Sequence, residues 1–399
     1  MTMRVSLAPA YPRARASDPS DAAPQPLLDP RGARILLGAL SETGAPVAAI
    51  SPAAHTLFGP RGACLAGRGG PLIICDTGHH RLLVWQRVPD MDNGPADLVI
   101  GQPDFRTEGR NAKGEIGPAS LNVPTGIAVG PDVLAVADAW NHRVLLWHDL
   151  PRSSNQPADI VLGQADFRSG EANRGLAAAR ADTLNWCYGV AIHDGRLFVA
   201  DAGNRRVLVW DEIPAVNGAP ADLVLGQRDF TTRDESAGEG AGAVGMRWPH
   251  SIAAAGMLFV ADAGNNRVMV WKTLPDRNGV PCDFVLGQAG FTGLDHNCAA
   301  YYPTASAMNM PYGLTVQSGY LVVADTANSR LLGFDTARLA MGAAATRLAG
   351  QSGFDDKGDN RWNVPSRDSL CWPYAVAARD NTLVVADSGN NRVLLWETA

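Results

Sequence analysis

Short runs of apolar residues, separated by Gly, Pro, Asn and Asp, follow one another along most of this chain. Residues 187–230 give an example, with the four runs CYGVAI, RLFVAD, RVLVW and DLVLGQRDF. Short runs that are apolar throughout, or that alternate apolar with polar residues, are typical of antiparallel β-strands rather than helices. The pattern therefore predicts units of four short strands.

One phrase of this pattern is written six times. The copies are CDTGHHRLLVW, ADAWNHRVLLW, ADAGNRRVLVW, ADAGNNRVMVW, ADTANSRLLGF and ADSGNNRVLLW. Their aspartates are 62, 63, 61, 63 and 62 residues apart, at Asp76, Asp138, Asp201, Asp262, Asp325 and Asp387. So regular a period indicates one structural unit repeated in a single closed assembly.

The turn residues place the strands within each unit. Segments such as Ala-Gly-Asn tolerate the left-handed backbone of a tight turn, so the second and third strands should form a hairpin. Four-stranded units repeated around an axis make a β-propeller. The expected fold is all-β, with six four-stranded antiparallel blades.

The two ends of the chain are expected to close the ring. The last repeat ends after its third strand, whereas Ala33 to Gly38 (ARILLG) lie in register with the fourth strands of the other repeats. We expect Ile35, Leu36 and Leu37 to form the outer strand of the blade that contains Trp396, which would remove an open seam. The domains are then a Pro/Ala-rich flexible tail over residues 1–32 and a propeller over residues 33–399.

The phrase AD-x-x-N-x-R-V-L-x-W, preceded by P-x-G-I-A-V, resembles the NHL repeat over residues 33–399. The resemblance implies a six-bladed propeller. Propellers of this family serve as protein-binding platforms, as RNA-binding domains and, in relatives such as peptidylglycine amidating lyase, as metal-assisted enzymes. Fold alone does not choose among these functions. The recurring VLGQ-x-DF phrase suggests a distinct bacterial-type subgroup, and the Ala-rich TARLAMGAAATRL of the fifth repeat suggests a short helical turn there.

The charge, hydrophobicity and cysteine content of the chain limit the classes of partner and the compartment that we expect. Net charge is −6, so the surplus of Lys and Arg that drives nucleic-acid binding is missing and nucleic acid is an unlikely partner. No apolar run is long enough for a membrane span or a signal-peptide core, and the six cysteines form no C-x-x-C motif. These features indicate a cytoplasmic protein with reduced thiols and no membrane partner.

The residues common to all repeats are expected to be structural. An Asp and an Arg recur in each phrase, where an Arg fork can bind both the turn carboxylate and backbone carbonyls. The Trp that ends most phrases is expected to anchor packing between blades. His79, His80 and His142 lie in the turns, where they look like substitutes for Asn.

Residues that differ between repeats, just before and at the start of the first strand, should surround one mouth of the central channel. The candidate binding residues there are aromatic or cationic: Trp186, Tyr188, Trp248, His250, Tyr312, Trp372, Tyr374, Arg61 and Arg247. Trp and Tyr supply much of the energy of interfaces and pockets. The same residues could instead plug the channel against solvent. Loops of around twenty residues, such as 228–246, share this face and are expected to be functional or mobile.

Three functions follow, in order of preference. The first is a non-enzymatic scaffold or accessory that binds another protein, within a larger assembly, and needs no cofactor. The second is a metal-dependent lyase or hydrolase with His250 at the axis, helped by Asn122, Asn185 and Asn309 or by Cys187 and Cys371. The third is RNA binding by Arg61, Arg106, Arg110, Lys113 and Arg247. No nucleophile or nucleotide-binding motif is present.

Overall fold

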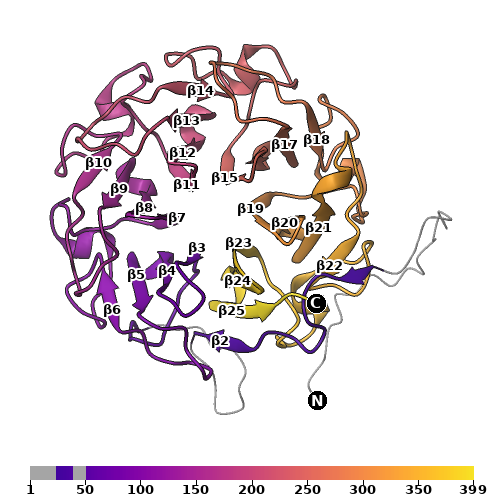
Figure 1. Ribbon diagram of the computed structural model, residues 1–399, viewed down its shortest axis with the longest axis horizontal. Helices are drawn as coiled ribbons and strands as arrows, with labels where there is room; N and C mark the ends of the chain where they lie inside the picture. The colour runs from indigo at the N-terminus through magenta and orange to yellow at the C-terminus, as the bar shows by residue number, and fades with distance from the viewer. Residues whose placement is uncertain (1–23, 39–50) are drawn as a thin grey trace, which may run out of the picture.

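The computed structural model describes residues 24–38 and 51–399. It shows six sheets arranged around a central axis, with no α-helix among the described residues (Figure 1). The predicted all-β fold with six four-stranded antiparallel blades is confirmed.

The blades use their strands in the same order from the axis outward. The inner strands are β3 (Gly62–Leu65), β7 (Pro124–Gly130), β11 (Cys187–His193), β15 (Pro249–Ala254), β19 (Pro311–Gln317) and β23 (Pro373–Arg379). The second strands are β4 (Leu72–Asp76), β8 (Val133–Asp138), β12 (Arg196–Asp201), β16 (Leu258–Asp262), β20 (Tyr320–Asp325) and β24 (Thr382–Asp387). The third strands are β5 (Arg81–Trp85), β9 (Arg143–Trp147), β13 (Arg206–Trp210), β17 (Arg267–Trp271), β21 (Arg330–Asp335) and β25 (Arg392–Glu397). The outer strands are β6 (Leu98–Ile100), β10 (Ile160–Leu162), β14 (Leu223–Leu225), β18 (Phe284–Leu286), β22 (Arg347–Ala349) and β2 (Ile35–Leu37).

The N-terminal segment closes the ring as predicted. Ile35, Leu36 and Leu37 of β2 pair antiparallel with β25 and complete the last blade. Residues 24–32, which we expected in the tail, also pack on the propeller: β1 (Gln25–Pro26) runs parallel to β22, and Leu27 and Leu28 are buried. The rest of the expected tail, residues 1–23, lies outside the described residues.

The core lies between blades. Each apolar cluster combines one face of a blade with the facing side of the next: Val144 and Leu146 of β9 pack with Leu197 of β12 and Trp210 of β13. The residues that end the third-strand phrases are at most 3% exposed, as expected for packing anchors. Trp147 also donates its indole N–H to the Gln156 carbonyl at 3.2 Å. These residues therefore hold neighbouring blades together.

Each hairpin turn is a short 3₁₀ helix followed by one left-handed residue. The six helices are η1 (Thr77–His79), η3 (Ala139–Asn141), η5 (Ala202–Asn204), η7 (Ala263–Asn265), η9 (Thr326–Asn328) and η12 (Ser388–Asn390). The left-handed residue is the one after the last residue of the 3₁₀ helix, which is Asn in five blades and His79 in the first; Asn266, with φ of 53°, is an example. The prediction put this conformation in Ala-Gly-Asn itself, whereas those residues form the 3₁₀ turn.

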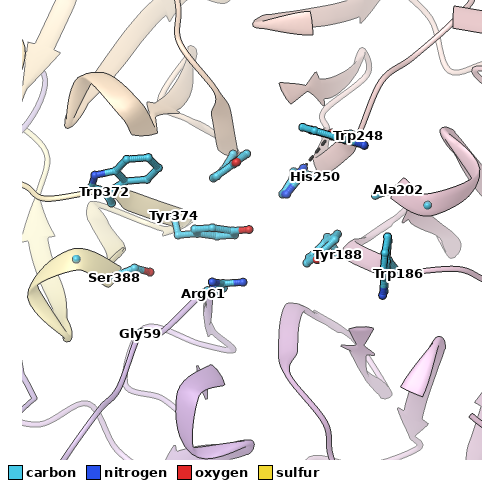
Figure 2. A pocket seen from close by; sticks show the side chains of 13 residues that line it. Gly59, Arg61, Trp186, Tyr188, Ala202, Trp248, His250, Trp372, Tyr374 and Ser388 are labelled. Atoms are coloured by element: carbon cyan, nitrogen blue, oxygen red, sulfur yellow. Dashed lines mark hydrogen bonds between the residues drawn. The ribbon is translucent and has the colours of Figure 1, made fainter. Parts of the chain in front are cut away.

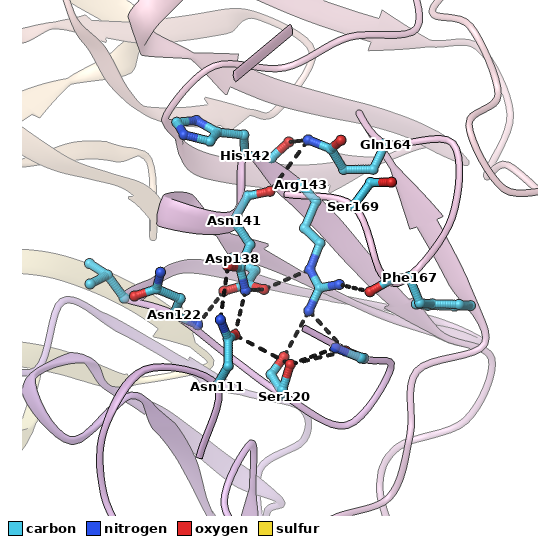
Figure 3. Close-up of polar contacts among 12 residues, drawn as sticks. Asn111, Ser120, Asn122, Asp138, Asn141, His142, Arg143, Gln164, Phe167 and Ser169 are labelled. Atoms are coloured by element: carbon cyan, nitrogen blue, oxygen red, sulfur yellow. Dashed lines mark hydrogen bonds and ion pairs between the residues drawn. The ribbon is translucent and has the colours of Figure 1, made fainter. Parts of the chain in front are cut away.

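The buried Asp–Arg pair ties the loops of each blade together (Figure 3). In the second blade, Arg143 Nε donates to Asp138 Oδ2 at 2.7 Å. The other guanidinium nitrogens donate to the carbonyls of Phe167, Gly117 and Ser120 at 2.7–3.0 Å. Since equivalent Asp–Arg pairs occur in all six blades, the structural interpretation of the pair is confirmed.

The long loops between blades have a regular internal structure. Five of them contain a second 3₁₀ segment: η2 (Arg110–Lys113), η4 (Ala172–Gly175), η6 (Glu235–Gly238), η8 (His296–Ala299) and η11 (Asp359–Trp362). In the loop before the third blade, Asn173 and Asn204 exchange side-chain hydrogen bonds at 3.0 and 2.8 Å. Gln164, from the VLGQ phrase, donates to the carbonyls of His142 and Glu171. The fifth blade also has the expected short helical turn, η10 (Thr336–Arg338).

Candidate functional site

The backbone just before each inner strand forms the rim of the channel mouth. The residue before the Pro, or its equivalent, has a left-handed φ between 49° and 57° in all six blades: Gly59, Val123, Trp186, Trp248, Met310 and Trp372. This conformation strains non-Gly residues, so the surrounding structure must hold it.

Two hydrogen bonds fix each rim position in most blades. The N–H of the residue before the rim residue donates to the turn aspartate, as Asn185 does to Asp201 at 2.7 Å. The rim N–H itself donates to the left-handed turn residue of the preceding blade, as Trp186 does to His142 Nδ1 at 2.9 Å. His80 accepts the Val123 N–H in the same way, and Asn266 accepts that of Met310. The turn histidines thus act as Asn substitutes, as the sequence indicated.

Three tryptophans stand exposed on this rim. The side chains of Trp186, Trp248 and Trp372 are 49%, 46% and 41% exposed, and Figure 2 shows them around the mouth. Exposure of this size means that these rings contribute little to the core.

Below the rim, an inner layer of rings stacks across the axis. His250 lies parallel to Tyr188 and to Tyr312, with ring centroids 4.7 and 4.2 Å apart. Tyr312 continues to Tyr374 at 4.6 Å, and the Arg61 guanidinium lies 4.9 Å from the Tyr374 centroid. Each of these residues is the first or second residue of its blade's inner strand or lies just before it, which is why they meet at the axis.

Rim and inner layer enclose a cavity of about 560 Å³. Eight of the nine predicted binding residues line it. Arg247 does not: its guanidinium lies 5.1 Å from the Trp248 ring, and its Nε is 3.1 Å from Glu235 Oε1. The volume is in the usual range of ligand pockets, about 300–1,000 Å³.

Burial favours the neutral forms of three residues of the inner layer, His250, Tyr312 and Tyr374. Burial lowers the pKa of His250 to about 4, and the Arg61 charge acts in the same direction. His250 Nδ1 lies 2.9 Å from the Trp248 carbonyl, which can only accept, so Nδ1 carries the proton and Nε2 is an acceptor. Burial also raises the pKa of the Tyr312 and Tyr374 hydroxyls.

The proposed combination of His250 with Cys187 and Cys371 does not form a metal-ligand set. No group of three or more His, Cys, Asp or Glu residues within residues 24–38 and 51–399 could hold a metal ion. Cys187 is buried and its thiol donates to the Arg143 carbonyl at 3.1 Å. All six cysteines are free.

Three of the basic residues proposed for RNA binding, Arg61, Arg110 and Arg247, make different contacts. Arg61 lies at the cavity, Arg247 pairs with Glu235, and the Arg110 guanidinium lies 4.9 Å from the Trp140 centroid. Among the described segments, no helix is long and apolar enough to cross a membrane.

Sequence reasoning missed the turn residues that complete the cavity and the amides that order the loops. Ala202 and Gly203 of one turn, and Ser388 and Gly389 of another, line the cavity. These turn residues could have been identified from the sequence, because strands of alternating direction place the turns on the same face as the long loops. The Gln of VLGQ and the loop Asn are also missed, although the Gln recurs in five copies of its phrase.

Comparison with known proteins finds matches to parts of longer proteins. No protein-family model matches. NHL repeat-containing protein 2 of Gallus gallus is 27% identical over 361 aligned residues, covering 68% of this chain and 46% of that protein. The Bos taurus protein of the same name is 39% identical over 74 residues, 18% of this chain and 9% of that protein. The chain therefore spans less than half the length of the curated relatives it matches.

Solved structures agree on the fold alone. A Bacteroides thetaiotaomicron protein of unknown function has a TM-score of 0.51 and 11% identity, covering 91% of this chain and 76% of that chain. A gluconolactonase from Xanthomonas campestris has a TM-score of 0.48 and 13% identity, covering 95% and 99% of the two chains, which is too distant to bear on activity. With its six blades and its repeated phrase, the chain is similar to the NHL-repeat proteins that it matches in sequence.

Proposed function

We propose that this propeller is a non-enzymatic interaction module that binds another protein, as a scaffold or accessory of a larger assembly, through the tryptophan rim and its cavity. The observation that carries the proposal is the exposure of Trp186, Trp248 and Trp372 around one cavity. Buried aromatic anchors, Trp above all, dominate the energy of protein interfaces. The six free cysteines support a reducing, cytoplasmic setting.

The position of the rim tryptophans favours recognition over packing. The N–H of the residue before each tryptophan donates to the turn aspartate. The N–H groups of Trp186 and Trp372 also donate to the neighbouring turn, so the side chains are not needed to fix the rim. The inner rings already stack across the channel. The structural role of closing the channel can therefore be assigned to the inner layer, which leaves the rim free to bind.

The experiment compares matched variants with a purified partner. The partner is obtained by co-purification from the cells that make the protein, identified by mass spectrometry and expressed alone. Replacing both Trp248 and Trp372 by Ala should weaken its binding at least about tenfold, because two hot-spot residues are lost. The control replaces Met91 and Val216, which are 65% and 64% exposed in the connections to outer strands, by Ala. Undiminished binding by a folded tryptophan variant would exclude the proposal.

The lyase or hydrolase alternative makes a different prediction. A metal-dependent enzyme would carry about one tightly bound metal per chain after purification, and a chelator would lower its stability. Elemental analysis before and after dialysis against chelator measures both. Stoichiometric metal would favour the enzyme over the interaction module.

A further inference from the structure

Arg61 lies at the floor of the mouth, where no described residue is its anionic partner. It occupies the position that Thr125, Tyr188, His250, Tyr312 and Tyr374 fill in the other blades. Its side chain makes no hydrogen bond or ion pair with the described residues, and its guanidinium carbon lies 4.9 Å from the centre of the Tyr374 ring. The six buried arginines of the repeats, by contrast, are all paired with aspartates.

The cavity offers Arg61 no negative charge. No Asp or Glu is among the residues that line it, within the part of the chain that the structure describes. Burial favours the neutral forms of His250, Tyr312 and Tyr374. Arg61 therefore supplies the formal charge of this lining. In a partly desolvated, apolar site, one uncompensated cation attracts an anion more strongly than it would in water.

The chemistry around Arg61 suits a carboxylate that is part of a larger, partly apolar segment. A guanidinium binds a carboxylate with two parallel hydrogen bonds. The hydroxyls of Tyr188 and Tyr374 have no hydrogen-bond partner among the described residues, so each is free to donate to a bound group. The aromatic walls suit the apolar part of the segment that carries the carboxylate, and His250 Nε2 can accept one of its N–H groups.

Access to Arg61 is open from the rim. Its blade carries Gly59 where three other blades carry Trp, and a Cβ at Gly59 would meet no atom within 4 Å. The rim is therefore asymmetric, with bulky rings on three blades and open space beside the cation.

We infer that the protein segment received by the mouth carries an Asp or Glu side chain that pairs with Arg61 on the cavity floor, between the rim tryptophans. This inference rests on the proposed function, because it names the partner's chemistry at the same site.

Selection from a peptide library tests the inference. The probe is a displayed library of random twelve-residue peptides, flanked on both sides by fixed linkers so that no terminal carboxylate is presented. It is panned against the full-length protein, against Arg61→Gln and Arg61→Lys, and against the variant with both Trp248 and Trp372 replaced by Ala. Wild type should enrich Asp or Glu beside apolar residues at least threefold over the input. Arg61→Gln should lose that enrichment, and Arg61→Lys should keep part of it.

The outcomes separate the two proposals. Peptides enriched in aromatic residues without acids would overturn the carboxylate inference and leave protein binding in place. An acidic preference that persists in Arg61→Gln would also overturn it, since a residue other than Arg61 would then bind the acidic side chain. If wild type and the tryptophan variant enrich the same peptides, both proposals fail.

A second measurement does not depend on the folding of the Arg61 variants. One selected peptide is resynthesised with its acidic residue replaced by the matching amide, Asp by Asn or Glu by Gln. Wild type should bind this peptide at least tenfold more weakly than the parent, and the difference should shrink as salt is raised. Equal binding of the two peptides contradicts the inference.

Discussion

Replacing Asp138 by Asn tests whether the repeated ion pair holds the loops of each blade. Asp138 is fully buried; its Oδ1 accepts the Asn122 N–H at 2.6 Å, and its Oδ2 accepts from Asn141 at 2.8 Å and Arg143 at 2.7 Å. An asparagine keeps the size and can keep the Oδ1 acceptor. Its amide nitrogen, however, would face two donors, and Arg143 would stay buried without a counter-charge.

The expected loss follows from this geometry. Removing one partner of a buried ion pair costs about 3–5 kcal/mol, since the other charge is left uncompensated. Burial also raises the pKa of Asp138 in the native protein, so desolvation already offsets part of the attraction to Arg143. We therefore expect a loss of about 3 kcal/mol in the free energy of unfolding, at the lower end of that range.

Urea unfolding at neutral pH, followed by tryptophan fluorescence, measures the loss as a shift of midpoint at equal m-value. The control is Asp335→Asn. Asp335 pairs with Arg338 at 3.5 Å, but the Arg338 side chain is 84% exposed, and Asn can replace Asp as the cap of η10. This control should lose less than about 1 kcal/mol. If Asp138→Asn loses no more than the control, the pair does not stabilise the blade as argued.

Three further predictions concern the axis, the seam and the rim. The pKa of His250 is about 4 in the folded protein, below its ordinary value of 6.5. Between pH 6.5 and 4, His250 therefore binds a proton more readily in the unfolded chain than in the folded protein. Wild type should therefore lose stability relative to His250→Phe as pH falls from 6.5 to 4, and urea midpoints that stay parallel would contradict this. Leu37→Ala, in the closing strand at 1% exposure, should cost about 2–5 kcal/mol in urea unfolding, whereas Leu176→Ala, at 42% exposure, should cost under about 0.5. Trp248→Gly should be more stable than Trp248→Ala by about 1 kcal/mol because φ is 54° there; a less stable Gly variant in thermal unfolding would refute the strain.

The repetition of the sequence made most of the fold predictable. One blade in isolation would leave the order of its strands open, but six copies at one period define the ring, and the missing fourth strand then points to residues 35–37. The inner position of the first strand likewise brings Tyr188, His250, Tyr312 and Tyr374 together at the axis. These positions follow from the backbone, which the repeat determines.

Contacts between side chains of different loops could not be predicted in the same way. Asn173 and Asn204 are 31 residues apart, and nothing local shows that their amides will pair. The pairing of Arg247 with Glu235 depends on the path of a long loop, so the sequence put Arg247 at the mouth as a binding residue while the structure turns it toward Glu235. The expectation that such loops are functional or mobile did not include the internal ties that order them.

Gly59→Trp tests whether the rim backbone keeps its conformation whichever side chain it carries, so that the binding residues can be changed independently. The Gly59 backbone already has the left-handed φ of the rim tryptophans, 52° against 49–54°, and its N–H donates to Asn391 at 2.8 Å as that of Trp186 does to His142. A Trp there should fold with a loss of about 1–3 kcal/mol, the cost of a non-Gly residue in this conformation. The added ring would occupy the open space beside Arg61.

Binding of the acidic peptide selected above should then fall at least tenfold, although Arg61 and all three rim tryptophans are unchanged. Gly59→Ala is the matched control, because it carries the same backbone strain without a ring. If Gly59→Trp binds the peptide as tightly as Gly59→Ala does, the peptide does not reach Arg61 through this side of the mouth. If instead Gly59→Trp unfolds far more easily than Gly59→Ala, the conformation of the rim depends on its side chains. The rim backbone and the binding side chains are then not independent, as we assumed.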